Sequence, residues 1–124
     1  MQNIKRFYDK PYMTIGIIVV NIIVFVLMSI SGSTLDAQYM AAHGAMYPEY
    51  IKDGQYWRLF TSMFMHFGLM HILNNMVVLG AVGQIVEKAM GHVKLLITFL
   101  VSGICGSVLS YIVMLYNNDF AVSA

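Results

Sequence analysis

Charged residues and cysteine are scarce in this sequence. Only 10% of its 124 residues are charged and 59% are hydrophobic, whereas an ordinary soluble domain carries about a quarter charged residues. The net charge is +1 without a basic block, which indicates neither a nucleic-acid surface nor a polybasic lipid-binding tail. The one cysteine, Cys105, lies in an apolar run and cannot form an internal disulfide. The composition therefore predicts a protein whose solvent is lipid.

Three long apolar stretches lie at about residues 11–30, 69–89 and 93–116. A helix needs roughly 20 residues to cross a hydrocarbon core about 30 Å thick, so each stretch is long enough to span it. The first is longer than the apolar core of a signal peptide, which has about 7 to 15 residues. We predict an all-α membrane protein with three transmembrane helices, forming a single domain over residues 1–124.

The connection between the first two spans, about residues 31–68, mixes apolar, aromatic and charged residues. It is too long for a tight hairpin and too apolar for a flexible linker. Its segment 55–65 combines aromatic residues and methionines with Arg58, a composition that suits the headgroup boundary. We therefore expect a folded external loop that is partly embedded in the membrane surface.

The placement of lysine and arginine predicts the orientation, because cytoplasmic flanks carry the excess of these residues. Lys5, Arg6 and Lys10 precede the first span, and Lys88 and Lys94 fall between the second and third. These two regions, and with them the N-terminus, should lie in the cytoplasm. The long loop and the C-terminal end should then lie outside.

Small residues recur in the third span. Gly103 and Ser107 are four residues apart, as are Gly106 and Ser110. Such pairs let helices approach closely in lipid. We expect them to form a helix-packing face.

A polar constellation follows the aromatic segment, with Trp57-Arg58, His66, His71 and Asn75 in the spacing W-R-x7-H-x4-H-x3-N. On a helix His71 and Asn75 project from one face. They would lie one to two turns below the outer surface, where water still reaches. Their N–H groups could stabilise the oxyanion that forms when a peptide carbonyl is attacked.

These polar residues also fit two other interpretations. Polar groups in a spanning helix often only hydrogen bond to neighbouring helices. A zinc site is disfavoured, because His66 and His71 are five residues apart and no acidic residue or second cysteine lies beside them. We predict no metal and no cofactor.

The runs 54–66 and 71–75, followed by Glu87 and Gly91, resemble the first half of the core of the rhomboid family of intramembrane serine proteases. The resemblance implies half of a six-span helical bundle. It also implies hydrolysis of peptide bonds in or beside the transmembrane segments of other membrane proteins, in a bacterial plasma membrane. The partners would be these substrates and the lipid bilayer. Glu87 matches an acidic residue near the cytoplasmic end of the second span, where we expect a cap or an interhelix hydrogen bond.

The same resemblance implies roles for the constellation. His71 and Asn75 match side chains that help to form the oxyanion hole, and His66 matches a supporting histidine near the active site. Trp57 and Arg58 match a loop motif that is structural in the family.

The family's nucleophile and base are missing from these 124 residues. Rhomboids carry Gly-x-Ser-Gly on the fourth span and a partnering histidine on the sixth, and neither is present. Ser123 follows Ala121-Val122 and precedes Ala124, so its context does not match. We expect Ser123 to be a lead-in residue and the chain to be an incomplete part that is inactive alone.

Two rival functions stay open at this point. A rhomboid-like protein that binds transmembrane clients without cleaving them would lack the serine or the later histidine. A piece of a transporter or channel could instead use His71 and Asn75 to line a polar path.

Overall fold

The computed structural model describes residues 10–118 and 121–123. The helices within these residues are α2 (Tyr12–Ser31), α3 (Ala37–Ala42), α4 (Pro48–Lys52), α5 (Arg58–Thr61), the 3-10 helix η1 (Ser62–Phe64), α6 (Gly68–Met90) and α7 (His92–Tyr116). α2, α6 and α7 each have the length and hydropathy to cross a membrane. The prediction of an all-α membrane protein with three transmembrane helices is confirmed. Lys5, Arg6 and Ala124, which entered the topology prediction, lie outside the described residues.

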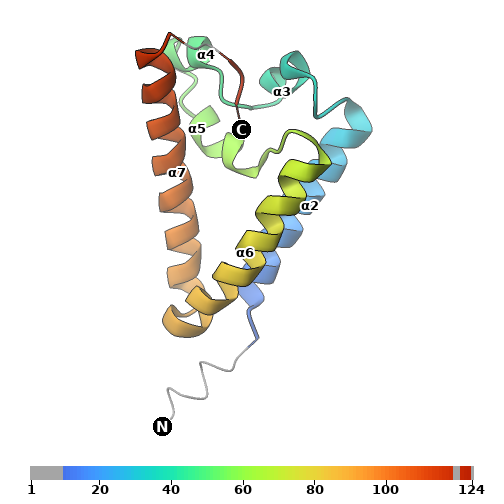
Figure 1. The fold of residues 1–124 in the computed structure, drawn as a ribbon, viewed down its shortest axis with the longest axis vertical. Coiled ribbons are helices and arrows are strands. Elements are labelled where there is room, and N and C mark those ends of the chain that lie inside the picture. Colours follow the sequence, from blue (N-terminus) through green and yellow to red (C-terminus); the bar gives the residue numbers. More distant parts are fainter. Residues whose placement is uncertain (1–9, 119–120, 124) are drawn as a thin grey trace.

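The three long helices form a V (Figure 1). α2 and α6 pack side by side, and α7 leaves α6 at Gly91 and diverges from it. Gly91 has a φ of +96°, a conformation that glycine adopts at little cost. Its N–H donates to the carbonyl oxygen of Glu87 at 2.7 Å. A single glycine thus ends α6 and turns the chain into α7.

The outside of the V is apolar, whereas several contacts within it are polar. Ile15 of α2 and Val101 of α7 are exposed, while Thr14 and Asn21 of α2 and Glu87 of α6 are almost completely buried. Hydrocarbon offers no hydrogen bonds, so polar groups of a spanning helix turn toward partner helices. This distribution is that of helices surrounded by lipid.

Glu87 joins the three long helices at the narrow end of the V. Its Oε2 accepts a hydrogen bond from the N–H of Met13 at 2.7 Å. Its Oε1 accepts the N–H of Thr14 at 2.8 Å and the Thr14 hydroxyl at 2.7 Å. The carboxylate also contacts the imidazole of His92, the first residue of α7. An anionic group satisfies N–H groups that a helix leaves unpaired in its first turn, and it complements the helix dipole there.

The connecting loop, residues 32–67, folds over the wide end of the V (Figure 1). Two clusters of buried apolar side chains stabilise it, with Met40, Ala45 and Met65 in one and Met46, Ile51 and Met114 in the other. Met114 belongs to α7, so the second cluster attaches the loop to that helix. The hydroxyl of Tyr39 donates to the carbonyl oxygen of Met28 at 2.6 Å, which attaches the loop to α2. The loop is therefore anchored to both arms of the V.

Arg58 holds the loop together from within. It is 4% exposed, and its Nη1 donates to the carbonyl oxygens of Ala41 and, at 2.8 Å, of Ala45. Its Nε donates to the side chain of Gln55 at 2.7 Å. Burial lowers the pKa of Arg58, but a guanidinium stays charged at neutral pH. Trp57 is 52% exposed and lies against the guanidinium, so Arg58 is the buried member of the pair.

Gly103 and Ser107 of α7 face the connecting loop in the described part of the chain. A side chain at Gly103 would collide with Met63 of η1, and one at Gly106 would meet nothing within 4 Å. The hydroxyl of Ser107 lies 3.4 Å from that of Ser62, again in η1. Within the described residues the connecting loop approaches this face of α7, and close packing between spanning helices at these positions stays a prediction.

Candidate active site

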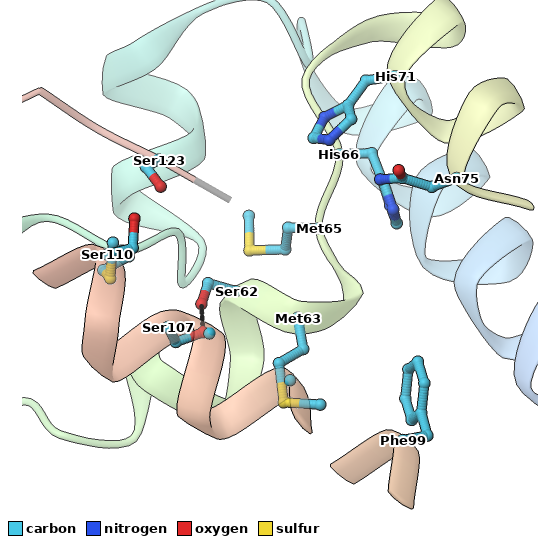
Figure 2. A pocket seen from close by; sticks show the side chains of 13 residues that line it. Ser62, Met63, Met65, His66, His71, Asn75, Phe99, Ser107, Ser110 and Ser123 are labelled. Atoms are coloured by element: carbon cyan, nitrogen blue, oxygen red, sulfur yellow. Dashed lines mark hydrogen bonds between the residues drawn. The ribbon is translucent and has the colours of Figure 1, made fainter. Parts of the chain in front are cut away.

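A cavity of about 270 Å³ lies between α6, α7 and the connecting loop (Figure 2). Its apolar lining includes Met46, Met63, Met65 and Phe99. Its polar lining consists of Ser62, His66, His71, Asn75, Ser107, Ser110 and Ser123. The fold therefore brings the histidines and the asparagine of the sequence motif to one cavity, together with serines from distant parts of the chain.

His71 and Asn75 occupy the α6 side of the cavity, one turn apart (Figure 2). Asn75 is exposed, and within the described residues its side chain makes no hydrogen bond. His71 is half-buried, and its Nδ1 accepts a hydrogen bond from the backbone N–H of Phe67 at 3.1 Å. Both side chains thus keep a polar group available to a molecule that enters the cavity.

His66 lies behind this pair. It is 5% exposed, and its ring meets that of His71 edge to face, with 5.0 Å between centroids. Burial, together with the neighbouring His71, lowers the pKa of His66 to about 4. Its Nδ1 has no hydrogen-bond partner among the described residues. At neutral pH His66 is therefore an uncharged ring that packs against His71.

Serine hydroxyls line the opposite side of the cavity (Figure 2). Ser107 and Ser110 come from α7, Ser62 comes from η1, and Ser123 comes from the C-terminal segment. In the part of the chain that the structure describes, no serine hydroxyl hydrogen bonds to a histidine. A serine needs an adjacent base to become a strong nucleophile. These serines consequently do not form a catalytic pair with His66 or His71.

The C-terminal segment reaches the cavity by pairing with the connecting loop. The N–H of Met46 donates to the carbonyl oxygen of Ser123 at 2.7 Å, and the N–H of Ser123 donates back to Met46 at 2.8 Å. This antiparallel bridge fixes the backbone of Ser123 beside the loop. The chain after α7 is thereby directed to the same cavity as His71 and Asn75.

Three residues of the predicted site lie away from the cavity. Glu87 is near the opposite end of α6, where it contacts α2 and α7. Trp57 and Arg58 belong to the loop, where Arg58 binds backbone carbonyls. None of these three residues lines the cavity.

Sequence reasoning missed several residues that shape the site. Met63 and Phe99 form part of the cavity wall, and Ser110 adds a hydroxyl. The sequence carried no signal for Met63 and Phe99, because their position depends on how the loop meets α7. The four-residue spacing of Ser107 from Gly103 and of Ser110 from Gly106 indicates helix packing and gives no sign of a cavity.

The chemistry of this arrangement is that of hydrogen-bond donors beside an apolar wall. An amide N–H of Asn75 and the free ring nitrogen of His71 lie on the same side of the cavity. Donors held in a site of low dielectric stabilise negative charge that develops on an oxygen atom. The cavity is therefore suited to receive an oxyanion.

Comparison with known proteins shows which family this chain resembles. The Rhomboid domain family matches residues 53–123. The rhomboid protease GluP of Bacillus subtilis is 34% identical over 115 residues, which cover 93% of this chain and 23% of that protein. The rhomboid protease GlpG of Pectobacterium atrosepticum is 38% identical over 92 residues, or 74% of this chain and 32% of that protein.

A plant protein is similar as well. RHOMBOID-like protein 7 of Arabidopsis thaliana is 38% identical over 84 residues, which cover 68% of this chain and 26% of that protein. The chain thus spans about a quarter to a third of the length of these relatives. No solved structure matches it.

Proposed function

This chain belongs to the rhomboid family, and from that premise we propose that it supplies the oxyanion-binding side of an intramembrane serine protease. His71 and Asn75 are the donors. The observation that carries the proposal is their shared position on one cavity wall, across from the segment that contains Ser123. Three helices able to span a membrane support its being an integral membrane protein.

In the proposed reaction a serine attacks the carbonyl carbon of the scissile peptide bond and gives its hydroxyl proton to a histidine base, and the carbonyl oxygen becomes an oxyanion. The Asn75 amide and the His71 ring N–H donate to this oxygen. Both donors come from one face of α6, and their hydrogen bonds strengthen as charge develops on the oxygen. Their contribution therefore falls on the transition state and not on substrate binding.

The nucleophile and its base come from residues outside these 124, since neither Gly-x-Ser-Gly nor the later histidine is among them. Ser123 acts as a lead-in residue that guides the chain into the cavity. The 124 residues alone do not cleave a transmembrane substrate, because no nucleophile is activated. Cleavage by this chain that is lost in Ser123→Ala would contradict this assignment.

The substrates are transmembrane segments of other membrane proteins, which reach the site from the lipid. The protein lies in a bacterial plasma membrane with its N-terminus in the cytoplasm. Support for the bacterial membrane comes from the B. subtilis relative, which aligns with 93% of the chain.

The decisive experiment replaces Asn75 in the full-length protein that contains this chain. Asn75→Ala lowers kcat on a transmembrane substrate by about 10² to 10³, or by about tenfold if His71 and backbone donors compensate. The thermal unfolding of the protein changes little, because Asn75 is exposed and makes no hydrogen bond in the described part of the chain. Asn74→Ala is the matched control, since Asn74 is an exposed neighbour that does not line the cavity.

Two outcomes would reject the proposal. If Asn75→Ala lowers stability and the surviving folded protein cleaves at the normal rate, Asn75 is a packing residue. If the full-length protein binds transmembrane clients but never cleaves them, it is a non-enzymatic member of the family.

A further inference from the structure

The backbone N–H of Phe67 donates to Nδ1 of His71, with 3.1 Å between the two nitrogens. Phe67 immediately precedes α6, and His71 is the fourth residue of that helix. The N–H groups at the start of a helix have no carbonyl partner within it. A side chain one turn further on can accept one of them, as in a capping box. The His71 ring performs this capping role at the start of α6.

The backbone around residue 68 aims this N–H at the ring. Phe67 has φ −83° and ψ 95°, and Gly68 has φ +80°. Only glycine adopts such a positive φ readily. A Cβ at position 68 would also lie 2.8 Å from a methyl carbon of Leu35. Glycine at this position therefore permits the sharp turn that brings the Phe67 N–H back to His71.

This contact has a consequence for the proton on the ring. A neutral imidazole has one donor nitrogen and one acceptor nitrogen. Nδ1 of His71 accepts from Phe67, so the proton must reside on Nε2. We propose that the Phe67 N–H fixes the tautomer of His71, and that Phe67 is thereby a positioning residue that acts through its main chain.

The surroundings of the ring support a single tautomer. Among the described residues, the Phe67 N–H is the one hydrogen-bond partner of the His71 ring. The adjacent His66 ring packs edge to face against the His71 ring, and this contact brings no carboxylate or carbonyl oxygen to the His71 nitrogens. His43 provides the opposite case, since its Nδ1 lies 2.8 Å from the carbonyl oxygen of Tyr39. A carbonyl requires a donor, so neutral His43 carries its proton on Nδ1.

The tautomer decides whether His71 can serve the reaction, and this step rests on the proposed function. With the proton on Nε2, the free nitrogen of His71 is a donor to the oxyanion. With the proton on Nδ1, Nε2 would present a lone pair to the negatively charged oxygen and repel it. The main-chain N–H of Phe67 thus selects the form of His71 that stabilises the transition state.

The first test reads the tautomer directly. The chain is labelled with ¹⁵N and studied by NMR in detergent micelles at neutral pH, with His71→Asn used to assign the ring signals. We expect a pyridine-type shift for Nδ1 and a pyrrole-type shift for Nε2 of His71, and the reverse for His43. A scalar coupling across the hydrogen bond should connect the Phe67 nitrogen to Nδ1 of His71. A pyrrole-type Nδ1 at His71 would overturn the proposal.

The second test removes the donor. Phe67→Pro deletes the N–H at a position whose φ of −83° is close to the range that proline imposes. Phe67→Ala is the matched control, because it removes the ring and keeps the N–H. We expect signal from the Nδ1-protonated form of His71 in Phe67→Pro and none in Phe67→Ala. If proline disturbs α6, a backbone ester at residue 67 removes the N–H alone. An unchanged tautomer in a folded protein that lacks the N–H would overturn the proposal.

Activity separates this inference from the function on which it rests. In the full-length protein, Phe67→Pro should lower kcat about tenfold or more, with KM little changed. Phe67→Ala should retain most of the turnover. If the tautomer changes and kcat does not, the positioning role of Phe67 stands and the oxyanion role of His71 is rejected.

Discussion

The carboxylate of Glu87 accepts two hydrogen bonds from Thr14 through a single oxygen, Oε1. The N–H of Thr14 donates at 2.8 Å and its hydroxyl at 2.7 Å. Thr14 is 2% exposed and Glu87 is 3% exposed, so both groups are removed from solvent. The contact fixes the start of α2 to the end of α6, and it is the main polar joint between these helices.

Loss of this joint should lower stability. Glu87→Gln keeps the shape of the side chain but removes its charge. The new NH₂ group would face N–H donors, with which it cannot form a hydrogen bond. The free energy of unfolding should therefore fall by about 1.5 to 3 kcal/mol. Thr14→Val should cost about 1 kcal/mol by removing only the hydroxyl. Unfolding by denaturant in detergent measures the free energy of unfolding of both variants. Glu49→Gln, at an exposed position of α4, is the control. Equal stability of Glu87→Gln and the control would show that the joint is dispensable.

Arg58 should matter more for the fold than Trp57. Arg58→Ala leaves the carbonyl oxygens of Ala41 and Ala45 without their buried donor, and we expect a loss of roughly 3 kcal/mol. Trp57→Ala removes a half-exposed ring and should cost well below the roughly 3 to 5 kcal/mol of a fully buried tryptophan. Tyr56→Ala, an exposed aromatic neighbour, is the control for Trp57→Ala. The same unfolding assay shows which substitution lowers the free energy of unfolding more. A larger decrease for Trp57→Ala than for Arg58→Ala would contradict the prediction.

His66 should make stability depend on pH in a defined window. Its pKa is about 4 in the folded protein against 6.5 for a free histidine, so the unfolded chain takes up a proton first as the pH falls. Above pH 6.5 both states are neutral and stability is complete. As the pH falls from 6.5 to about 4, the free energy of unfolding should decrease by up to roughly 3 kcal/mol relative to that of His66→Gln. Below about pH 4 this difference should stay constant. Parallel pH profiles for wild type and His66→Gln would disprove this, and His43→Gln serves as the exposed control.

The membrane orientation can be tested with reporter fusions. Lys10 precedes α2, and Lys88 and Lys94 flank the turn between α6 and α7 at the same end of the molecule. A phosphatase that is active only outside the cytoplasm should be inactive when fused after Met90 and active when fused after Ala124. A fluorescent reporter that folds only in the cytoplasm should give the complementary pattern. The reverse result would place the cavity on the cytoplasmic side.

The sequence was sufficient to predict the three long helices because hydropathy over about twenty residues is a local property. The helical period likewise placed His71 and Asn75 on one face, and both line the cavity. These features depend only on the local sequence and not on contacts with the rest of the chain.

Features that depend on distant contacts could not be predicted. One hydrogen-bond partner of Glu87 is Thr14, 73 residues earlier in the chain. Gly103 accommodates Met63 because the loop folds against α7, which no periodicity in either segment indicates. The capping of the Phe67 N–H by His71 depends on the backbone turn at Gly68, and spacing alone does not encode it.

The joint between α2 and α6 also has a consequence for the timing of synthesis. Thr14 and Glu87 are 73 residues apart, and a ribosome adds about 5 to 20 residues per second. The start of α2 must therefore wait roughly 4 to 15 seconds after translation before its carboxylate partner is made. During this interval the first helix lacks the Glu87 carboxylate, so the hydroxyl and N–H of Thr14 need other hydrogen-bond partners, such as water at the membrane surface or a carbonyl of the same helix.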